Sequence, residues 1–149
     1  MPASFGLKNE YRTYYVVFQE SRFNCVWRAW TGPGFRHIWT FWPLYVGEPG
    51  LLTPRWTLKF EPLANHFDID LWYADPDEVA ASFLEKSKVT DILKIQLLFR
   101  TGSEFVPRGV MNCVSSVKAC IGVRAWHIIT PKQLYDFLIH EGAESLRGI

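Results

Sequence analysis

The sequence has few of the residues that build disulfide frameworks or metal sites. Its 149 residues contain three cysteines, Cys25, Cys113 and Cys120, which is too few for the disulfide scaffold of a small secreted domain. No CxxC, HxxxH or HExxH pattern occurs, and the two carboxylates at positions 68 and 70 alone are typical of a solvated strand. We therefore expect a reduced protein without a metal ion.

Unbalanced charge and long apolar runs are also lacking. The 16 Lys and Arg residues nearly balance the 15 Asp and Glu residues, for a formal net charge of +1, so electrostatics predicts neither a nucleic-acid nor a membrane partner. The turn at residues 32–34 is followed by neither a lysine nor a helix start, so we expect no phosphate loop and no cofactor. No apolar run approaches the ~18 residues of a membrane span, and no secretion-signal pattern opens the chain. The protein is expected to be soluble and cytoplasmic at synthesis.

Aromatic side chains are abundant instead. They make up 16% of the chain and include seven tryptophans. Such residues fill the core of a small β-rich domain, and they are also enriched where proteins bind one another. A length of 149 residues is most economically a single domain, residues 1–149, with one hydrophobic core.

Strand patterns dominate the first part of the chain, and helix patterns cluster in the last third. Runs of β-branched and aromatic residues between Gly/Pro turns predict strands. The expected strands are residues 11–19, 23–30, 35–45, 55–61, 67–72 and 91–99. Helices are predicted to begin after Asp75, Asn112 and Thr130, each of which can cap a helix. This arrangement favours an α+β fold with an antiparallel sheet.

Cys113 stands where a reactive thiol is expected. It follows the capping residue Asn112 and opens a predicted helix, so its sulfur lies near the partial positive charge of unpaired backbone N–H groups, which stabilises a thiolate. The alternative is an ordinary buried cysteine, because the same helix face also carries Val117 and Cys120. Cys25 and Cys120 have no comparable position and are expected to fill the core.

His37 is the histidine expected to accept the proton of that thiol. It lies near the start of a predicted strand, beside a turn, from where it can reach the end of a neighbouring helix. The rival candidates are His66, His127 and His140.

A third side chain should orient the imidazole ring by accepting its other N–H. If the strands at 35–45 and 55–61 form a hairpin, the end of the second lies beside His37. Glu61 is then the first candidate for the third residue, followed by Asn65 and His66. The pattern alone does not determine the register of such a hairpin.

The order of these features resembles the circularly permuted papain-like proteins, which include the permuted NlpC/P60 and lecithin:retinol-acyltransferase-like groups. The matching segments are residues 34–37 (Gly-Phe-Arg-His) and 112–118 (Asn-Cys-Val-Ser-Ser-Val-Lys), with the cysteine after the histidine. The resemblance implies an antiparallel sheet packed against a Cys-bearing helix. It also implies acyl transfer or hydrolysis in which Cys113 attacks a carbonyl, His37 moves the proton, and Glu61 or Asn65 holds the ring.

A second likeness, to short phage-encoded proteins, lies in the C-terminal part of the chain. It rests on Asn112-Cys113, Val117-Lys118, Gly122 and residues 130–135 (Thr-Pro-Lys-Gln-Leu-Tyr), and it implies a phage origin.

Two functions are therefore expected. The first is a small papain-like cysteine peptidase or amidase that hydrolyses an amide or thioester bond, with peptidoglycan peptides as its substrate. The second is a non-catalytic phage protein that keeps the papain-like scaffold, either as a virion component or as a module that binds a host protein.

Overall fold

The computed structural model describes residues 10–20, 32–44, 56–63, 66–99 and 112–148. Within these residues the chain forms three helices and one six-stranded sheet, in which neighbouring strands are antiparallel. The order across the sheet is β4-β3-β2-β1-β5-β6. The strands are β1 Glu10–Gln19, β2 His37–Leu44, β3 Trp56–Pro62, β4 Phe67–Trp72, β5 Val89–Phe99 and β6 Glu144–Ser145.

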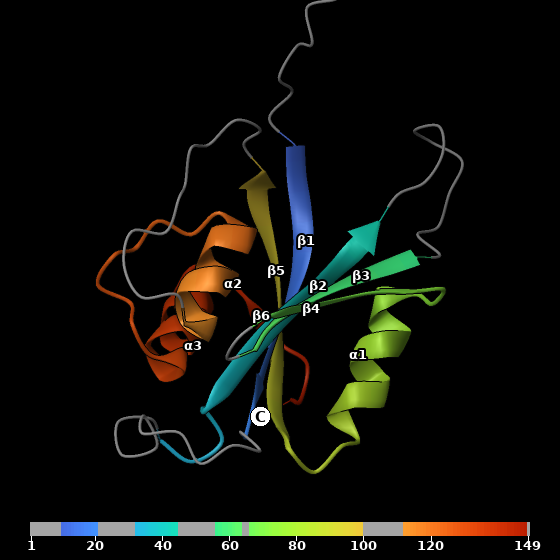
Figure 1. Cartoon of the computed structure of the whole chain (residues 1–149), viewed down its shortest axis with the longest axis horizontal. Coiled ribbons are helices and arrows are strands. Elements are labelled where there is room, and N and C mark those ends of the chain that lie inside the picture. The colour runs from blue at the N-terminus through green and yellow to red at the C-terminus, as the bar shows by residue number, and fades with distance from the viewer. Residues whose placement is uncertain (1–9, 21–31, 45–55, 64–65, 100–111, 149) are drawn as a thin grey trace, which may run out of the picture.

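Helices cover the sheet from both sides, so the fold has three layers (Figure 1). Successive residues of a strand point to opposite faces. In β1, Phe18 lies on the face that packs against α2 (Cys113–Ile121) and α3 (Pro131–His140). Val17 lies on the opposite face, which packs against α1 (Pro76–Leu84). Both faces of the sheet centre are therefore buried, which explains the continuous apolar and aromatic run of β1.

Each helix begins at a capping side chain. The caps are Asp75 for α1, Asn112 for α2 and Thr130 for α3. Each accepts a hydrogen bond from a backbone N–H two or three residues later, and in α2 and α3 a return bond completes a capping box. Caps of this kind satisfy N–H groups that the helix itself leaves unpaired.

The structure confirms the expected α+β class and the antiparallel sheet. Five expected strands are present, with ends displaced by at most two residues. The strand expected at 23–30 lies outside the described residues. The sequence did not predict β6, because two residues carry no pattern of their own and only pairing with β5 defines them. None of the helices in the described part is long and apolar enough to cross a membrane.

A buried carboxylate joins the C-terminal segment to β5. Asp91 is only 5% exposed. Its Oδ2 accepts hydrogen bonds from the hydroxyls of Tyr135 at 2.9 Å and Ser145 at 2.7 Å, and its Oδ1 accepts one from the backbone N–H of Arg147 at 3.2 Å. The guanidinium of Arg147 donates in turn to two backbone carbonyls. The side chain of Asp91 on β5 thus holds together α3, β6 and Arg147, which lies two residues after the end of β6.

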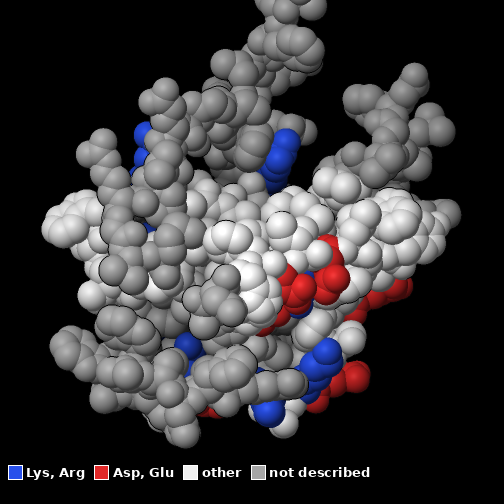
Figure 2. Space-filling model, viewed as in Figure 1, with Lys and Arg blue, Asp and Glu red and all other residues white. Residues whose placement is uncertain are grey.

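The edge strand β4 carries two kinds of exposed side chain. Phe67, Ile69 and Leu71 form an apolar row, between 48% and 61% exposed, while the carboxylates of Asp68 and Asp70 point to the other face. Figure 2 shows acidic side chains near the centre of the view, over β4, amid uncharged surface. Charged side chains on an edge strand disfavour pairing with the edge of another sheet.

Candidate functional site

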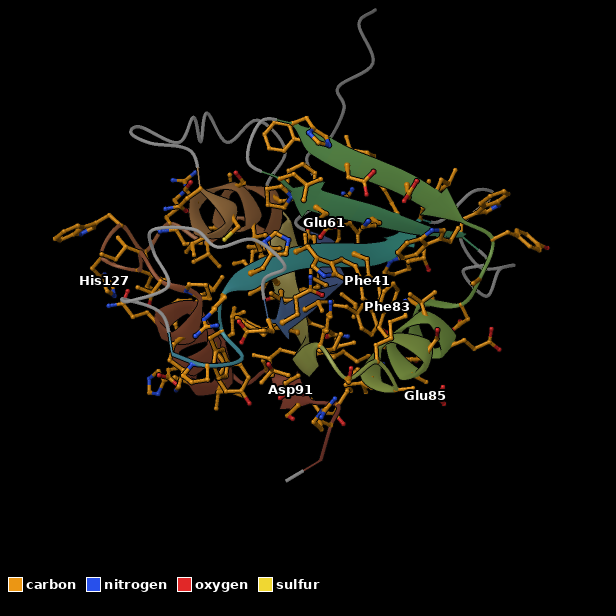
Figure 3. The ribbon with its side chains drawn as sticks, turned by 60° about the horizontal axis from the view of Figure 1, so that its bottom comes forward. Phe41, Glu61, Phe83, Glu85, Asp91 and His127 are labelled. Carbon is orange, nitrogen blue, oxygen red and sulfur yellow. The ribbon has the colours of Figure 1, made fainter. Side chains whose placement is uncertain are left out.

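The candidate site lies where β2 begins and β3 ends. Thr40 lies opposite Phe60 in the ladder between these strands, so the next step along β3 brings Glu61 opposite Trp39. His37 is two residues from Trp39 and shares its face. The pairing of β2 with β3 therefore places Glu61 diagonally next to His37. Figure 3 shows Glu61 toward the end of β3, which is the end of the strand nearer to α2.

His37 and Glu61 form a close hydrogen bond. The distance from His37 Nε2 to Glu61 Oε1 is 2.9 Å, and the two side chains are only 15% and 16% exposed. Because Glu61 occupies Nε2, the ring nitrogen left for a second partner is Nδ1. A carboxylate on one nitrogen holds an imidazole in a single orientation with the other nitrogen available.

Cys113 is the first residue of α2. Asn112 Oδ1 accepts a hydrogen bond from the Ser115 backbone N–H at 2.8 Å, and the Ser115 hydroxyl accepts one from the Asn112 N–H at 2.9 Å. Val114 and Val117 are buried in the core and hold the helix against the sheet. The thiol of Cys113 is free and half-buried, and the Cys113 side chain lies close enough to His37 to raise the pKa of its imidazole.

The surroundings of His37 favour its charged form. Burial alone lowers the pKa of an imidazole. The interactions of the ring with Cys113 and with the Glu61 carboxylate outweigh burial and raise the pKa of His37 to about 9. At neutral pH the ring is therefore an imidazolium that can give up a proton.

Glu61 is held as a carboxylate by cations on both of its oxygens. Burial alone would raise its pKa, but the hydrogen bonds and charges of His37 and Lys59 outweigh burial and lower the pKa of Glu61 to about 2. Lys59 Nζ lies 2.7 Å from Glu61 Oε2, and it lies 2.6 Å from Asp68 Oδ2. Charges of alternating sign therefore extend from Asp68 through Lys59 and Glu61 to His37.

We expect His37 to stabilise the fold at acidic and neutral pH and to lose this effect in alkali. Its folded-state pKa of about 9 lies above the ordinary value of 6.5, so its contribution is complete below pH 6.5 and disappears as the pH rises through 9. His37→Gln should lower the free energy of unfolding by about 2–3 kcal/mol near pH 6 and by much less near pH 10. Urea titrations of both proteins across this range measure the difference, and a difference that stays constant above pH 9 would contradict the prediction.

The other candidates named from the sequence either lie outside the described residues or have different surroundings. Asn65 and Cys25 lie outside the described residues. Burial raises the pKa of Cys120 to about 12, so this thiol is uncharged at neutral pH. The remaining histidines, His66, His127 and His140, are exposed. Of the named candidates, the structure brings Cys113, His37 and Glu61 together.

Lys59 was not among the site residues predicted from the sequence. It precedes Glu61 by two residues, so the alternation of a strand puts both side chains on one face. Once Glu61 is a candidate, that spacing is the signal that could have identified its cationic partner. A lysine on a strand is usually solvated, however, and the 9% exposure of Lys59 depends on contacts with other strands.

The residues that meet here have an arrangement that can activate a nucleophile: a thiol close to an imidazole, one nitrogen of which is held by a carboxylate. In the described part of the chain, no three His, Cys, Asp or Glu side chains are grouped so as to hold a metal ion. No protein-family model, curated protein or solved structure matches this chain.

Proposed function

We propose that this chain is a small cysteine hydrolase of the permuted papain-like kind, phage-encoded, which cleaves amide or thioester bonds in substrates such as peptidoglycan peptides. The observation that carries the proposal is the contact of His37 with both Cys113 and Glu61. These residues come from a helix start and two strands that are distant in the sequence. Strongly shifted pKa values on a buried His–Glu pair beside an accessible nucleophile are typical of functional sites.

In the proposed reaction, the Cys113 thiolate attacks the carbonyl carbon of the substrate and a C–S bond forms. The His37 imidazolium gives its Nδ1 proton to the leaving amine or thiol as the bond to that group breaks. The acyl group is then held on Cys113 as a thioester. Water gives a proton to the neutral ring of His37 and attacks the thioester, which releases a carboxylic acid and restores the thiolate and the imidazolium. Glu61 keeps the ring oriented in both steps.

The start of α2 supplies donors for the oxyanion that forms on the carbonyl. The first backbone N–H groups of a helix have no carbonyl partner within it. The capping box uses the N–H of Ser115, while those of Cys113 and Val114 precede it at the positive end of the helix dipole. A tetrahedral intermediate on the Cys113 sulfur lies beside these two groups, which is the position that stabilises its negative charge.

Alkylation of the native protein tests the proposal. At about pH 6.5, iodoacetamide should modify Cys113 at least about tenfold faster than a free model thiol, because a neighbouring imidazolium stabilises a thiolate, whereas a free thiol is almost fully protonated at this pH. His37→Ala should remove this excess rate. Peptide mass spectrometry assigns the modified cysteine, and Cys120→Ala is the matched control, which should react like the wild type. Labelling of Cys113 no faster than the model thiol would refute the hydrolase.

The second candidate is a non-catalytic phage protein that binds a partner as a virion component or host-directed module. Trp126 is 87% exposed and Ile129 is 63% exposed, both between α2 and α3. Large apolar side chains exposed together are typical of surfaces that bind other proteins. A binding module needs no activated thiol, so the same alkylation experiment separates the two functions.

A further inference from the structure

Lys59 is a buried lysine whose charge is surrounded by specific partners. The residue is 9% exposed, and its Nζ lies 2.7 Å from Glu61 Oε2 and 2.6 Å from Asp68 Oδ2. The ammonium also lies 5.5 Å from the ring centre of Trp39 and 6.0 Å from that of Trp72. Burial of an ammonium group is unfavourable unless such partners compensate, so these contacts hold the side chain in one position.

We propose that Lys59 is a positioning residue of the candidate site, which fixes the carboxylate of Glu61 so that Oε1 faces His37. Lys59 occupies Oε2, and Oε1 then lies 2.9 Å from His37 Nε2. A carboxylate fixed in this way orients the imidazole before substrate binds, with no further loss of side-chain freedom. The catalytic consequence rests on the proposed hydrolase function, whereas the positioning itself does not.

The edge strand β4 supports this arrangement from outside. Asp68 lies opposite Glu61 in the ladder between β3 and β4. Asp68 and Asp70 have side chains 40% and 50% exposed, against 16% for Glu61, so water screens their interactions with Lys59 more strongly. Their carboxylates hold Lys59 from the solvent side, and the least screened partner, Glu61, is the one that Lys59 orients most.

β5 offers a matched control for Lys59. Lys94 Nζ lies 2.8 Å from Asp77 Oδ1 and 5.4 Å from the ring centre of Tyr15. It therefore also combines a strand position, a carboxylate partner and an aromatic ring, but β1 separates its strand from β2. Removing the charge of Lys94 should leave the site unchanged.

The positioning role predicts that Glu61 affects His37 strongly only while Lys59 is present. The midpoint of the His37 ring titration, followed by NMR, should fall by about 1–2 pH units in Glu61→Gln. In Lys59→Met, which keeps an apolar stem, the further change Glu61→Gln should lower the midpoint by less than half as much. The same Glu61→Gln change in Lys94→Met should have its full effect. An undiminished effect of Glu61→Gln in the Lys59→Met protein would overturn the proposal.

A measurement with Lys59 in place keeps the proposal testable if Lys59→Met does not fold. The side-chain ammonium resonance of Lys59 should shift as His37 titrates, because Glu61 joins the two groups, and Glu61→Gln should abolish this shift. The ammonium resonance of Lys94 should not respond. A Lys59 resonance that ignores the titration of His37, or that still follows it in Glu61→Gln, would overturn the proposal.

These titrations are independent of catalysis. If Cys113 shows no excess reactivity while Lys59 controls the coupling between Glu61 and His37, the hydrolase function fails and the positioning role stands. If Cys113 is reactive and the coupling is unchanged in Lys59→Met, the hydrolase stands and the positioning role fails.

Discussion

An activated ester such as p-nitrophenyl acetate should acylate the wild-type protein on Cys113, and Cys113→Ala should slow this reaction by ~10³-fold or more. The reason is that the residues around the thiol have no function in the attack once the nucleophile is absent. A burst of p-nitrophenolate and the mass of the acylated protein measure the reaction. His37→Ala should cause a loss of similar size, because the members of such a unit act together.

Cys120 provides the control for this experiment. It belongs to the same helix, but burial raises its pKa to about 12, so its thiol is uncharged and a poor nucleophile at neutral pH. Cys120→Ala should therefore acylate at the wild-type rate. Acylation that continues in Cys113→Ala at the wild-type rate would show that the nucleophile is another residue.

Asp91→Ala should lower the free energy of unfolding by about 3 kcal/mol. The substitution leaves the hydroxyls of Tyr135 and Ser145 and the backbone N–H of Arg147 without the acceptor that each has in the wild type. Donors left unpaired in a mostly buried place cost more than the hydrogen bonds themselves contribute. Urea unfolding followed by tryptophan fluorescence measures the change.

Two further variants control for the size of this effect. Ser145→Ala removes a single donor to Asp91 and should cost about 1 kcal/mol. Glu85→Ala changes an exposed acidic residue and should alter the free energy of unfolding by no more than about 0.5 kcal/mol. If Asp91→Ala were no more destabilising than Glu85→Ala, Asp91 would not be what holds the C-terminal segment to β5.

The two clusters of charge differ in what they can do. Asp91 is enclosed by donors that complete its hydrogen bonding, and neither a thiol nor an imidazole is among these partners, so the cluster joins elements of the fold. The carboxylate of Glu61 is hydrogen-bonded to one ring nitrogen of His37, and the other ring nitrogen is left for a half-buried thiol. Only the second arrangement leaves a reactive atom for a substrate.

Much of the fold followed from local patterns. The runs of β-branched and aromatic residues predicted β1 to β5 to within two residues at each end, and the caps at Asp75, Asn112 and Thr130 predicted where the helices begin. Strand-forming runs and helix caps depend on residues a few positions apart, so they can be recognised along the chain. β6 could not be predicted in this way, because its two residues are a strand only through their pairing with β5.

The sequence by itself determined that Cys113 opens a helix and that His37 lies at a strand start, since both depend on adjacent residues. Only the tertiary structure decided that these two side chains meet, because their contact depends on how α2 packs on the sheet. The choice of Glu61 as the partner of His37 depended on the register of β2 with β3, which side-chain patterns leave open. The role of Lys59 required more, because Asp68 and Trp72 of β4 and Trp39 of β2 enclose its charge. Local order could be predicted from the sequence, whereas the electrostatic environment of the site arises from the packing of elements distant in the chain.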